Sequence, residues 1–218
     1  MNFKPSKHDR PVFGKLASEY GLTYYGTVIP DEVDDYIPVR GMTASPEQID
    51  DNYTTGTVAG YNVQLLQRSH DVYLPDSRRV NRTWTICQVD LKQRHIPHFI
   101  IGSKGKPSND DSSLASYLRM YEINLDSLGC VIADDFAHKF AVYISPQDIQ
   151  PVQEFFSPEA QAMLSLNLPD TDIEINDNRL YTYNHHRPIE LTDLDKQLRI
   201  SIWLAKHIDS SINLDNNL

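Results

Sequence analysis

Long apolar runs are absent from this chain of 218 residues. Runs such as Phe99 to Ile101 contain only a few residues, whereas a helix that crosses a bilayer needs about 20. The charged N-terminal stretch, residues 1–13, is not followed by an apolar segment, which argues against a secretory signal. We therefore expect a protein with no membrane segment.

Cysteine is also scarce. Cys87 and Cys130 are too few for a disulfide framework, and neither belongs to a CxxC pair. We predict two buried thiols in a reducing compartment, which corresponds to a cytoplasmic location.

Motifs for nucleotide-dependent chemistry and for serine hydrolases are missing. The nine glycines form neither a Walker loop nor a Gly-x-Gly-x-x-Gly run, and there is no Gly-x-Ser-x-Gly elbow. Cys87 lies in the middle of an apolar segment, where a thiol is normally inert. The sequence thus predicts no cofactor and assigns no residue to a catalytic, cofactor-binding or metal-binding site.

Positive charge is in deficit, and it is unevenly spread. The net charge of -10 argues against general binding to nucleic acid or to an anionic membrane. Residues 68–106 nevertheless contain eight Lys or Arg against three acids, while residues 30–52 contain seven acids against Arg40. We favour an interpretation in which these charges are neutralised within the fold or solvated. A mild anionic-ligand face is the alternative.

Residues 53–101 have the character of a β-sheet. Residues 53–70 resemble two strands joined by a tight turn at 59–62, in which Gly60 and Asn62 could supply positive φ angles. The stretch "RTWTICQVDL" carries apolar groups on both faces, which suits a central strand. The stretch "IPHFIIGS" predicts a further strand, and residues 30–52 before the sheet predict a long exposed loop.

The second half of the chain mixes helices with strands. We predict a short helix over 114–121 and a hairpin with its turn at Asp177-Asn178. Residues 129–144 have strand character, at least from Phe140 to Ile144. Thr192 is the expected N-cap of the longest helix. That helix has a buried stripe formed by Leu194, Leu198, Ile202 and Ala205.

Two Ser-Pro sequences mark helix starts in this half. Pro at the first helical position sacrifices no hydrogen bond, because the N–H at that position has no partner within the helix. A preceding Ser can accept a hydrogen bond from an amide N–H of the first turn. We therefore interpret Ser145-Pro146 and Ser157-Pro158 as capping signals rather than as recognition or modification motifs.

These elements predict an α+β fold. It is a mostly antiparallel sheet built from hairpins, with a few covering helices that include a long C-terminal helix. We treat residues 1–218 as a single domain, with a possible subdomain break near 103–113.

The run "DDFAHKFAVYISPQDIQPVQEFFSPEAQAML" and the hairpin after it resemble a bacterial family. This family is the uncharacterised domain-of-unknown-function family 3137, together with related small hypothetical proteins. The resemblance covers about half of the chain. It depends on packing and turn residues, namely Phe136, Phe140, Val142, Tyr143, Pro158, Met163, Ile175, Leu180 and Tyr181. It implies the fold and no catalytic residue. Many members carry flanking membrane helices, which we do not expect here.

Histidine pairs are the first candidates for a metal or acid–base site. His95 and His98 enter a strand at Pro97 and should face opposite sides of it, so we expect an exposed His95 and a packed His98. The adjacent His185 and His186 should also point apart, and a metal would need distant acids to complete its ligand set.

Paired carboxylates are the second candidates. Asp50-Asp51 and Asp134-Asp135 are neighbours only in sequence. We interpret both pairs as marks of solvated turns rather than as general acid–base pairs.

The leading prediction is a non-catalytic binding or scaffolding module with a protein partner. Its contact surface would be the basic tip around Arg78, Arg79 and Arg82, or the acidic loop around residues 31–35. Nucleic acid and membrane are not expected as partners.

The alternative is an enzyme of unrecognised type, a hydrolase that uses His with Asp or Glu. It requires a deep pocket in which His95, His98 or His185 lies beside a carboxylate.

Overall fold

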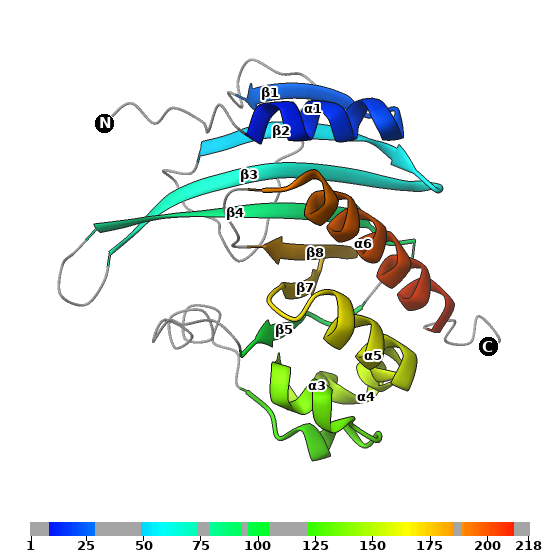
Figure 1. Ribbon diagram of the computed structural model, residues 1–218. Helices are drawn as coiled ribbons and strands as arrows, with labels where there is room; N and C mark the ends of the chain where they lie inside the picture. Colours follow the sequence, from blue (N-terminus) through cyan, green and yellow to red (C-terminus); the bar gives the residue numbers. More distant parts are fainter. Residues whose placement is uncertain are drawn as a thin grey trace.

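The structure is a computed structural model that describes residues 9–28, 49–73, 79–92, 96–104, 122–184 and 189–211. Eight strands and several helices follow one another along these segments (Figure 1). The strands are β1 Thr23–Val28, β2 Ile49–Val58, β3 Tyr61–Tyr73, β4 Arg79–Asp90, β5 Phe99–Ser103, β6 Phe140–Ile144, β7 Asp172–Asn176 and β8 Arg179–Asn184. The α-helices are α1 Asp9–Tyr20, α3 Asp134–Lys139, α4 Ile149–Val152, α5 Pro158–Asn167 and α6 Leu191–Ser211, and the 3-10 helices are η1 Leu125–Leu128, η2 Pro146–Asp148 and η3 Gln153–Phe156.

All eight strands belong to one antiparallel sheet, in the order β1-β2-β3-β4-β8-β7-β5-β6. The predicted α+β fold is therefore confirmed, and β4 is a central strand, as its two apolar faces indicated. Strands on both sides of the 103–113 segment share the sheet. Residues 105–121, which include the predicted helix over 114–121, lie outside the described residues. The number of domains stays a prediction.

The helices cover one face of the sheet (Figure 1). The main core lies between that face and α1, α5 and α6. A smaller cluster of buried apolar side chains lies on the other face, with Trp84, Ile86 and Tyr183 among its members. Because strand residues alternate between faces, one strand such as β4 supplies both clusters.

Helix α6 is fixed to the centre of the sheet by apolar packing and by buried polar contacts. Its predicted stripe is buried, and Gln197 and Ser201 lie within the same stripe. The Gln197 amide donates to the backbone oxygens of Thr85 on β4 (3.3 Å) and Thr182 on β8 (3.0 Å). The Ser201 hydroxyl lies 2.9 Å from the Thr182 hydroxyl. These directional bonds fix which turn of α6 faces which strands.

The two hairpin turns that the structure describes each have two central residues with positive φ. Asp177 (φ 50°) and Asn178 (φ 60°) connect β7 to β8, as predicted. The turn between β2 and β3 uses Ala59 (φ 51°) and Gly60 (φ 81°). The prediction that Asn62 supplies a positive φ there is wrong, because Asn62 already pairs with Thr57 in the ladder.

Of the three side-chain caps predicted at helix starts, the one at Ser157 is present. The Ser157 hydroxyl accepts from the Ala160 N–H (3.2 Å) and caps α5. Pro146 begins the 3-10 helix η2 directly after Ser145, as the Ser-Pro signal predicts, but the Ser145 side chain makes no capping bond. Helix α6 begins at Leu191, so Thr192 lies inside its first turn and is not its N-cap.

The strand predicted at least from Phe140 to Ile144 is confirmed as β6, whereas strand character does not extend over the whole of 129–144. Asp134–Lys139 forms helix α3, and the strand begins at Phe140. Asp134 and Asp135 lie in the first turn of α3, where they are exposed and favoured by the helix dipole.

Asp50 and Asp51 are not in a solvated turn, and this prediction is wrong. Strand β2 begins at Ile49, and both carboxylates are 4% exposed. Two hydrogen bonds of 2.7 Å join the Arg68 guanidinium to the Asp50 carboxylate. Thr27 donates to Asp51. One basic and one acidic residue thus neutralise each other inside the fold, which agrees with the favoured interpretation of the charge distribution at this position.

The Arg68–Asp50 pair yields a stability prediction. The Arg68 side chain is fully buried, so Arg68→Ala removes the buried guanidinium that neutralises the Asp50 carboxylate and should lower the free energy of unfolding by about 3–5 kcal/mol. Urea denaturation monitored by circular dichroism measures the loss. Arg199→Ala is the control, because the Arg199–Asp195 pair is largely exposed and should contribute less than about 1 kcal/mol. Equal losses for the two variants would contradict a desolvated pair.

Candidate functional site

Several predicted contact and site residues lie outside the described part of the chain. They are Arg78, His95, His185, His186 and the acidic loop around 31–35. The side chains of Arg79 and Arg82 are likewise outside it, so both proposed contact surfaces stay predictions.

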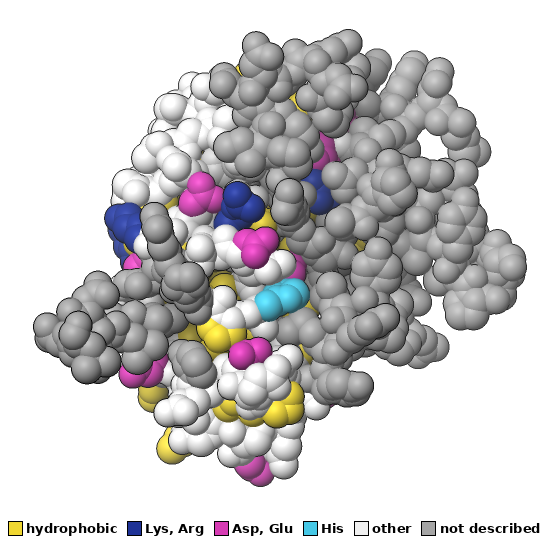
Figure 2. Space-filling view, turned by 180° about the vertical axis from the view of Figure 1, so that it is seen from behind, with side chains coloured by type: hydrophobic (Ala, Val, Ile, Leu, Met, Phe, Trp, Pro, Cys, Tyr) yellow, Lys and Arg dark blue, Asp and Glu magenta, His cyan; other side chains and the backbone are white. Residues whose placement is uncertain are grey.

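His98 is the one predicted histidine that the structure describes, and it lies beside a carboxylate. Its Nε2 is 2.8 Å from Oε1 of Glu174, and its side chain is one-third exposed (33%) rather than packed. Glu174 is almost fully buried, and its other oxygen accepts from the Tyr183 hydroxyl (2.5 Å). Figure 2 shows the side of the molecule opposite the helices, with acidic side chains and a histidine near its middle. The cluster is the His–carboxylate pairing that the hydrolase alternative requires.

A row of polar side chains crosses the same sheet face. Successive strand pairings place Gln64 opposite Gln88, Gln88 opposite Tyr181, and Tyr181 opposite Glu174. The carbonyl oxygens of Gln64 and Gln88 are buried and have no hydrogen-bond partner in the described part of the chain, which is uncommon for buried polar atoms. The row contains hydrogen-bond acceptors and a phenol but no Ser or Cys nucleophile, which suits binding better than covalent chemistry.

A serine and a histidine meet between α5 and α6. Ser157 Oγ is 3.2 Å from Nε2 of His207, which stacks on Trp203 at a centroid distance of 5.3 Å. A Ser–His pair can activate a nucleophile if nearby N–H groups bind the developing oxyanion. Here the residue after the serine is Pro158, which has no N–H, and the Ala160 N–H is already bonded to Ser157 Oγ. The arrangement therefore caps a helix and is not built for acyl transfer.

Two pockets lie at opposite ends of the antiparallel pair formed by α5 and α6. The first, which we name the apolar pocket, has a volume of about 530 Å³ and lies where α5 begins and α6 ends. Its lining residues are Cys130, Val131, Gln153, Glu154, Phe156, Ser157, Pro158 and Ser211. Burial raises the pKa of the Cys130 thiol above its usual value.

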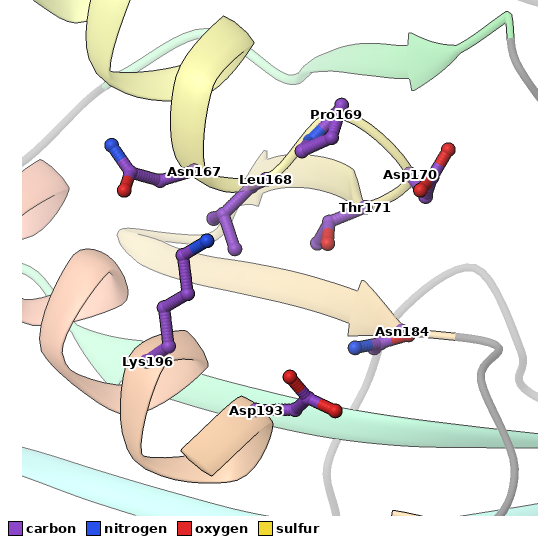
Figure 3. Close-up of a pocket in the computed structure, with 8 residues that line it drawn as sticks. All are labelled: Asn167, Leu168, Pro169, Asp170, Thr171, Asn184, Asp193 and Lys196. Atoms are coloured by element: carbon purple, nitrogen blue, oxygen red, sulfur yellow. The ribbon is translucent and has the colours of Figure 1, made fainter.

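The second, the polar pocket, has a volume of about 360 Å³ and lies where α5 ends and α6 begins (Figure 3). Its lining residues are Asn167, Leu168, Pro169, Asp170, Thr171, Asn184, Asp193 and Lys196. Lys196 reaches from α6 toward Leu168, and Asn184 lies at the end of β8 near Asp193 (Figure 3). The pocket thus collects side chains from a helix end, a loop, a strand end and a second helix.

Two ionic groups of the polar pocket, those of Asp193 and Lys196, are available to a ligand. Asp193 and Lys196 are exposed, and neither forms an ion pair with any residue that the structure describes. Asn167 uses its amide nitrogen on the Met163 backbone oxygen (3.0 Å). The pocket therefore offers an ammonium donor and carboxylate and amide acceptors within one small volume.

Neither pocket contains His98 or Glu174. The described residues hold no cluster of three or more His, Cys, Asp or Glu that could bind a metal ion. Among the helices described, none has the length and apolar character to cross a membrane. The cytoplasmic location stays a prediction.

Comparisons with known proteins give one informative result. No protein-family model matches the sequence, and no curated protein matches it significantly. A solved structure, that of the mycobacterial trehalose monomycolate transport factor A, TtfA, is similar in fold with a TM-score of 0.57. The similarity covers 95% of this chain and 96% of TtfA at 11% sequence identity. At this identity it shows a shared fold, while the resemblance to family 3137 stays a prediction.

Neither pocket was predicted from the sequence, nor was the place of Lys196 in the polar pocket. Residues 167–171 and 193–196 meet only because α5 and α6 pack side by side, and no motif joins them. The available signal was the Asp193-x-x-Lys196 spacing, since residues three apart share a helix face.

Thiol reactivity should separate the two cysteines. Cys87 is fully buried in β4, and burial raises its pKa to about 12, despite hydrogen bonds from Ser201 and Thr182 that lower it. Cys130 is only partly buried, so the prediction of two buried thiols holds for Cys87 alone. We expect Ellman's reagent at pH 8 to modify Cys130 while Cys87 reacts only after unfolding. Rapid modification of Cys87 in the native protein would contradict the placement of β4, and Cys130→Ser identifies the reactive thiol.

Ser157 should behave as a cap and not as a nucleophile. Ser157→Ala should lower the free energy of unfolding by about 1 kcal/mol, whereas Ser157→Asp, which can also cap, should retain most of it. Thermal denaturation measures both variants. Release of p-nitrophenol from its acetate ester should be the same for all three proteins. Loss of an ester-hydrolysing activity in both variants would instead support the hydrolase alternative.

Proposed function

We propose that this chain is a non-catalytic binding module that holds a small, hydroxyl-rich ligand in the polar pocket. The observation that carries the proposal is that the Lys196 ammonium and the Asp193 carboxylate line one pocket, and neither has an ion-pair partner among the described residues. The other polar groups that line this pocket are two amides, a hydroxyl and the Asp170 carboxylate. Sugar hydroxyl groups donate to carboxylate and amide oxygens and accept from ammonium and amide N–H groups. Leu168 and Pro169 add an apolar surface for the C–H face of a ring.

The absence of a working nucleophile among the described residues favours binding over catalysis. Ser157 is followed by Pro158 and lacks the neighbouring N–H that an oxyanion requires. Cys87 is buried, and its raised pKa keeps the thiol protonated at neutral pH. His98 is bonded to Glu174 on the other face of the sheet, away from the polar pocket. Among the described residues that line the polar pocket there are Asp and Lys but no Ser, Cys or His.

The similarity of fold to TtfA supports ligand binding by analogy. TtfA is named as a transport factor for trehalose monomycolate, a sugar ester. Because one fold supports many functions, this likeness suggests a ligand class and does not establish one. It supports testing sugars first.

Binding to the polar pocket can be tested with trehalose and glucose as probes, by NMR titration of the 15N-labelled protein. We expect saturable shifts centred on residues 167–171 and 193–196 with at least one sugar. Lys196→Ala should weaken binding about tenfold, since a hydrogen bond to a charged group is worth about 1.5–3 kcal/mol.

Lys206→Ala is the matched control, because Lys206 is an exposed lysine of α6 that does not line the pocket. Its affinity should equal that of the unaltered protein. Absence of saturable shifts with both sugars, or equal weakening by the two lysine variants, would contradict the proposal.

A further inference from the structure

The apolar pocket has features of a docking site for a side chain from another molecule. Val131, Phe156 and Pro158 supply apolar surface to it. Val131 is 85% exposed, which is unusual for a large apolar residue on this protein. Buried Phe156 forms the rigid part, because it contacts Phe155, Phe136 and Phe99 in the main core. A pre-formed apolar recess with one exposed apolar side chain at its edge suits an anchor residue.

The charge around the apolar pocket is negative. Among the described residues that line it, Glu154 is charged and none is basic. Glu154 and the nearby Glu159 are exposed and have no ion-pair partner in the part of the chain that the structure describes. The whole chain carries a net charge of -10. A second copy of this acidic chain or a fatty acid would therefore be repelled, whereas a basic segment would be attracted.

We propose that the apolar pocket docks a partner protein through a segment in which an apolar side chain lies next to Lys or Arg. The apolar side chain enters the recess beside Phe156 and Val131, and the basic side chain pairs with Glu154. This inference goes beyond the proposed ligand binding and does not depend on it, because the polar pocket lies at the other end of α5 and α6.

Cys130 makes the proposal testable before any partner is known, because it lines the apolar pocket. The probe is a set of peptides selected from a random displayed library against the intact protein. We expect the selected peptides to share an apolar residue adjacent to Lys or Arg. At saturation they should slow modification of Cys130 by Ellman's reagent at least about tenfold, since a seated anchor excludes water and reagent.

Matched variants locate the binding site. Val131→Ser and Glu154→Lys should each weaken the selected peptides about tenfold, the second with loss of salt dependence. Leu166→Ser and Glu122→Lys are the controls, because both residues are exposed and neither lines the pocket. Both controls should bind as the unaltered protein does.

Three outcomes would overturn the proposal. They are failure to enrich any peptide, peptides that bind without protecting Cys130, and peptides rich in Asp or Glu. Protection of Cys130 by decanoate but not by peptides would assign the pocket to a lipid chain instead. Because Lys196 lies at the other pocket, sugar binding measured on the same protein separates failure of this proposal from failure of the proposed function.

Discussion

Helix α6 can occupy only one position on the sheet, and the arrangement of both pockets depends on that position. Its buried stripe includes Gln197 and Ser201 among apolar residues, and these two polar side chains must find partners once they leave water. The Gln197 amide donates hydrogen bonds to backbone oxygens of both β4 and β8, and the Ser201 hydroxyl is hydrogen-bonded to the Thr182 hydroxyl. A shift by one turn would leave those groups unpaired, which makes the position of α6 more specific than apolar packing alone would. Contacts near its two ends, from Tyr20 to Asp195 and from Tyr61 to Asp209, add to this.

Once α6 is fixed, α5 lies antiparallel beside it, and the ends of the pair differ chemically. One end combines the α6 N-terminus with the loop before β7 and is rich in polar side chains. The other end combines the α5 N-terminus with η3 and the segment before α3, and it exposes apolar side chains beside Glu154. A single helix pair therefore carries two surfaces of opposite character, which is suited to a module that holds a ligand at one end and a partner at the other.

The sheet faces divide the remaining polar groups in a similar way. On the helix-covered face, polar side chains such as Thr182 are used in packing α6. On the other face lie the buried Arg68–Asp50 pair, the His98–Glu174–Tyr183 cluster and the amide oxygens of Gln64 and Gln88, which have no hydrogen-bond partner among the described residues. The ion pair explains part of the uneven charge along the chain, since a basic strand residue and an acidic one neutralise each other across β2 and β3. None of these groups is arranged as a nucleophile with its base.

The sequence by itself determined the features that depend on neighbouring residues. The Asp177-Asn178 turn, the central character of β4, the Ser157 cap and the α6 stripe all follow from local chemistry or from a short period. The sequence was less reliable where local signals compete, as at Ala59-Gly60 and at α3.

Only the tertiary structure decided that His98 meets Glu174, that Asp50 meets Arg68 inside the sheet, and that Lys196 shares a pocket with Asn184. His98 and Glu174 are 76 residues apart in sequence, and Ser157 and His207 are 50 residues apart. Such contacts arise from the order of the strands and the position of α6, which depend on burial summed over the whole core and not on any short motif.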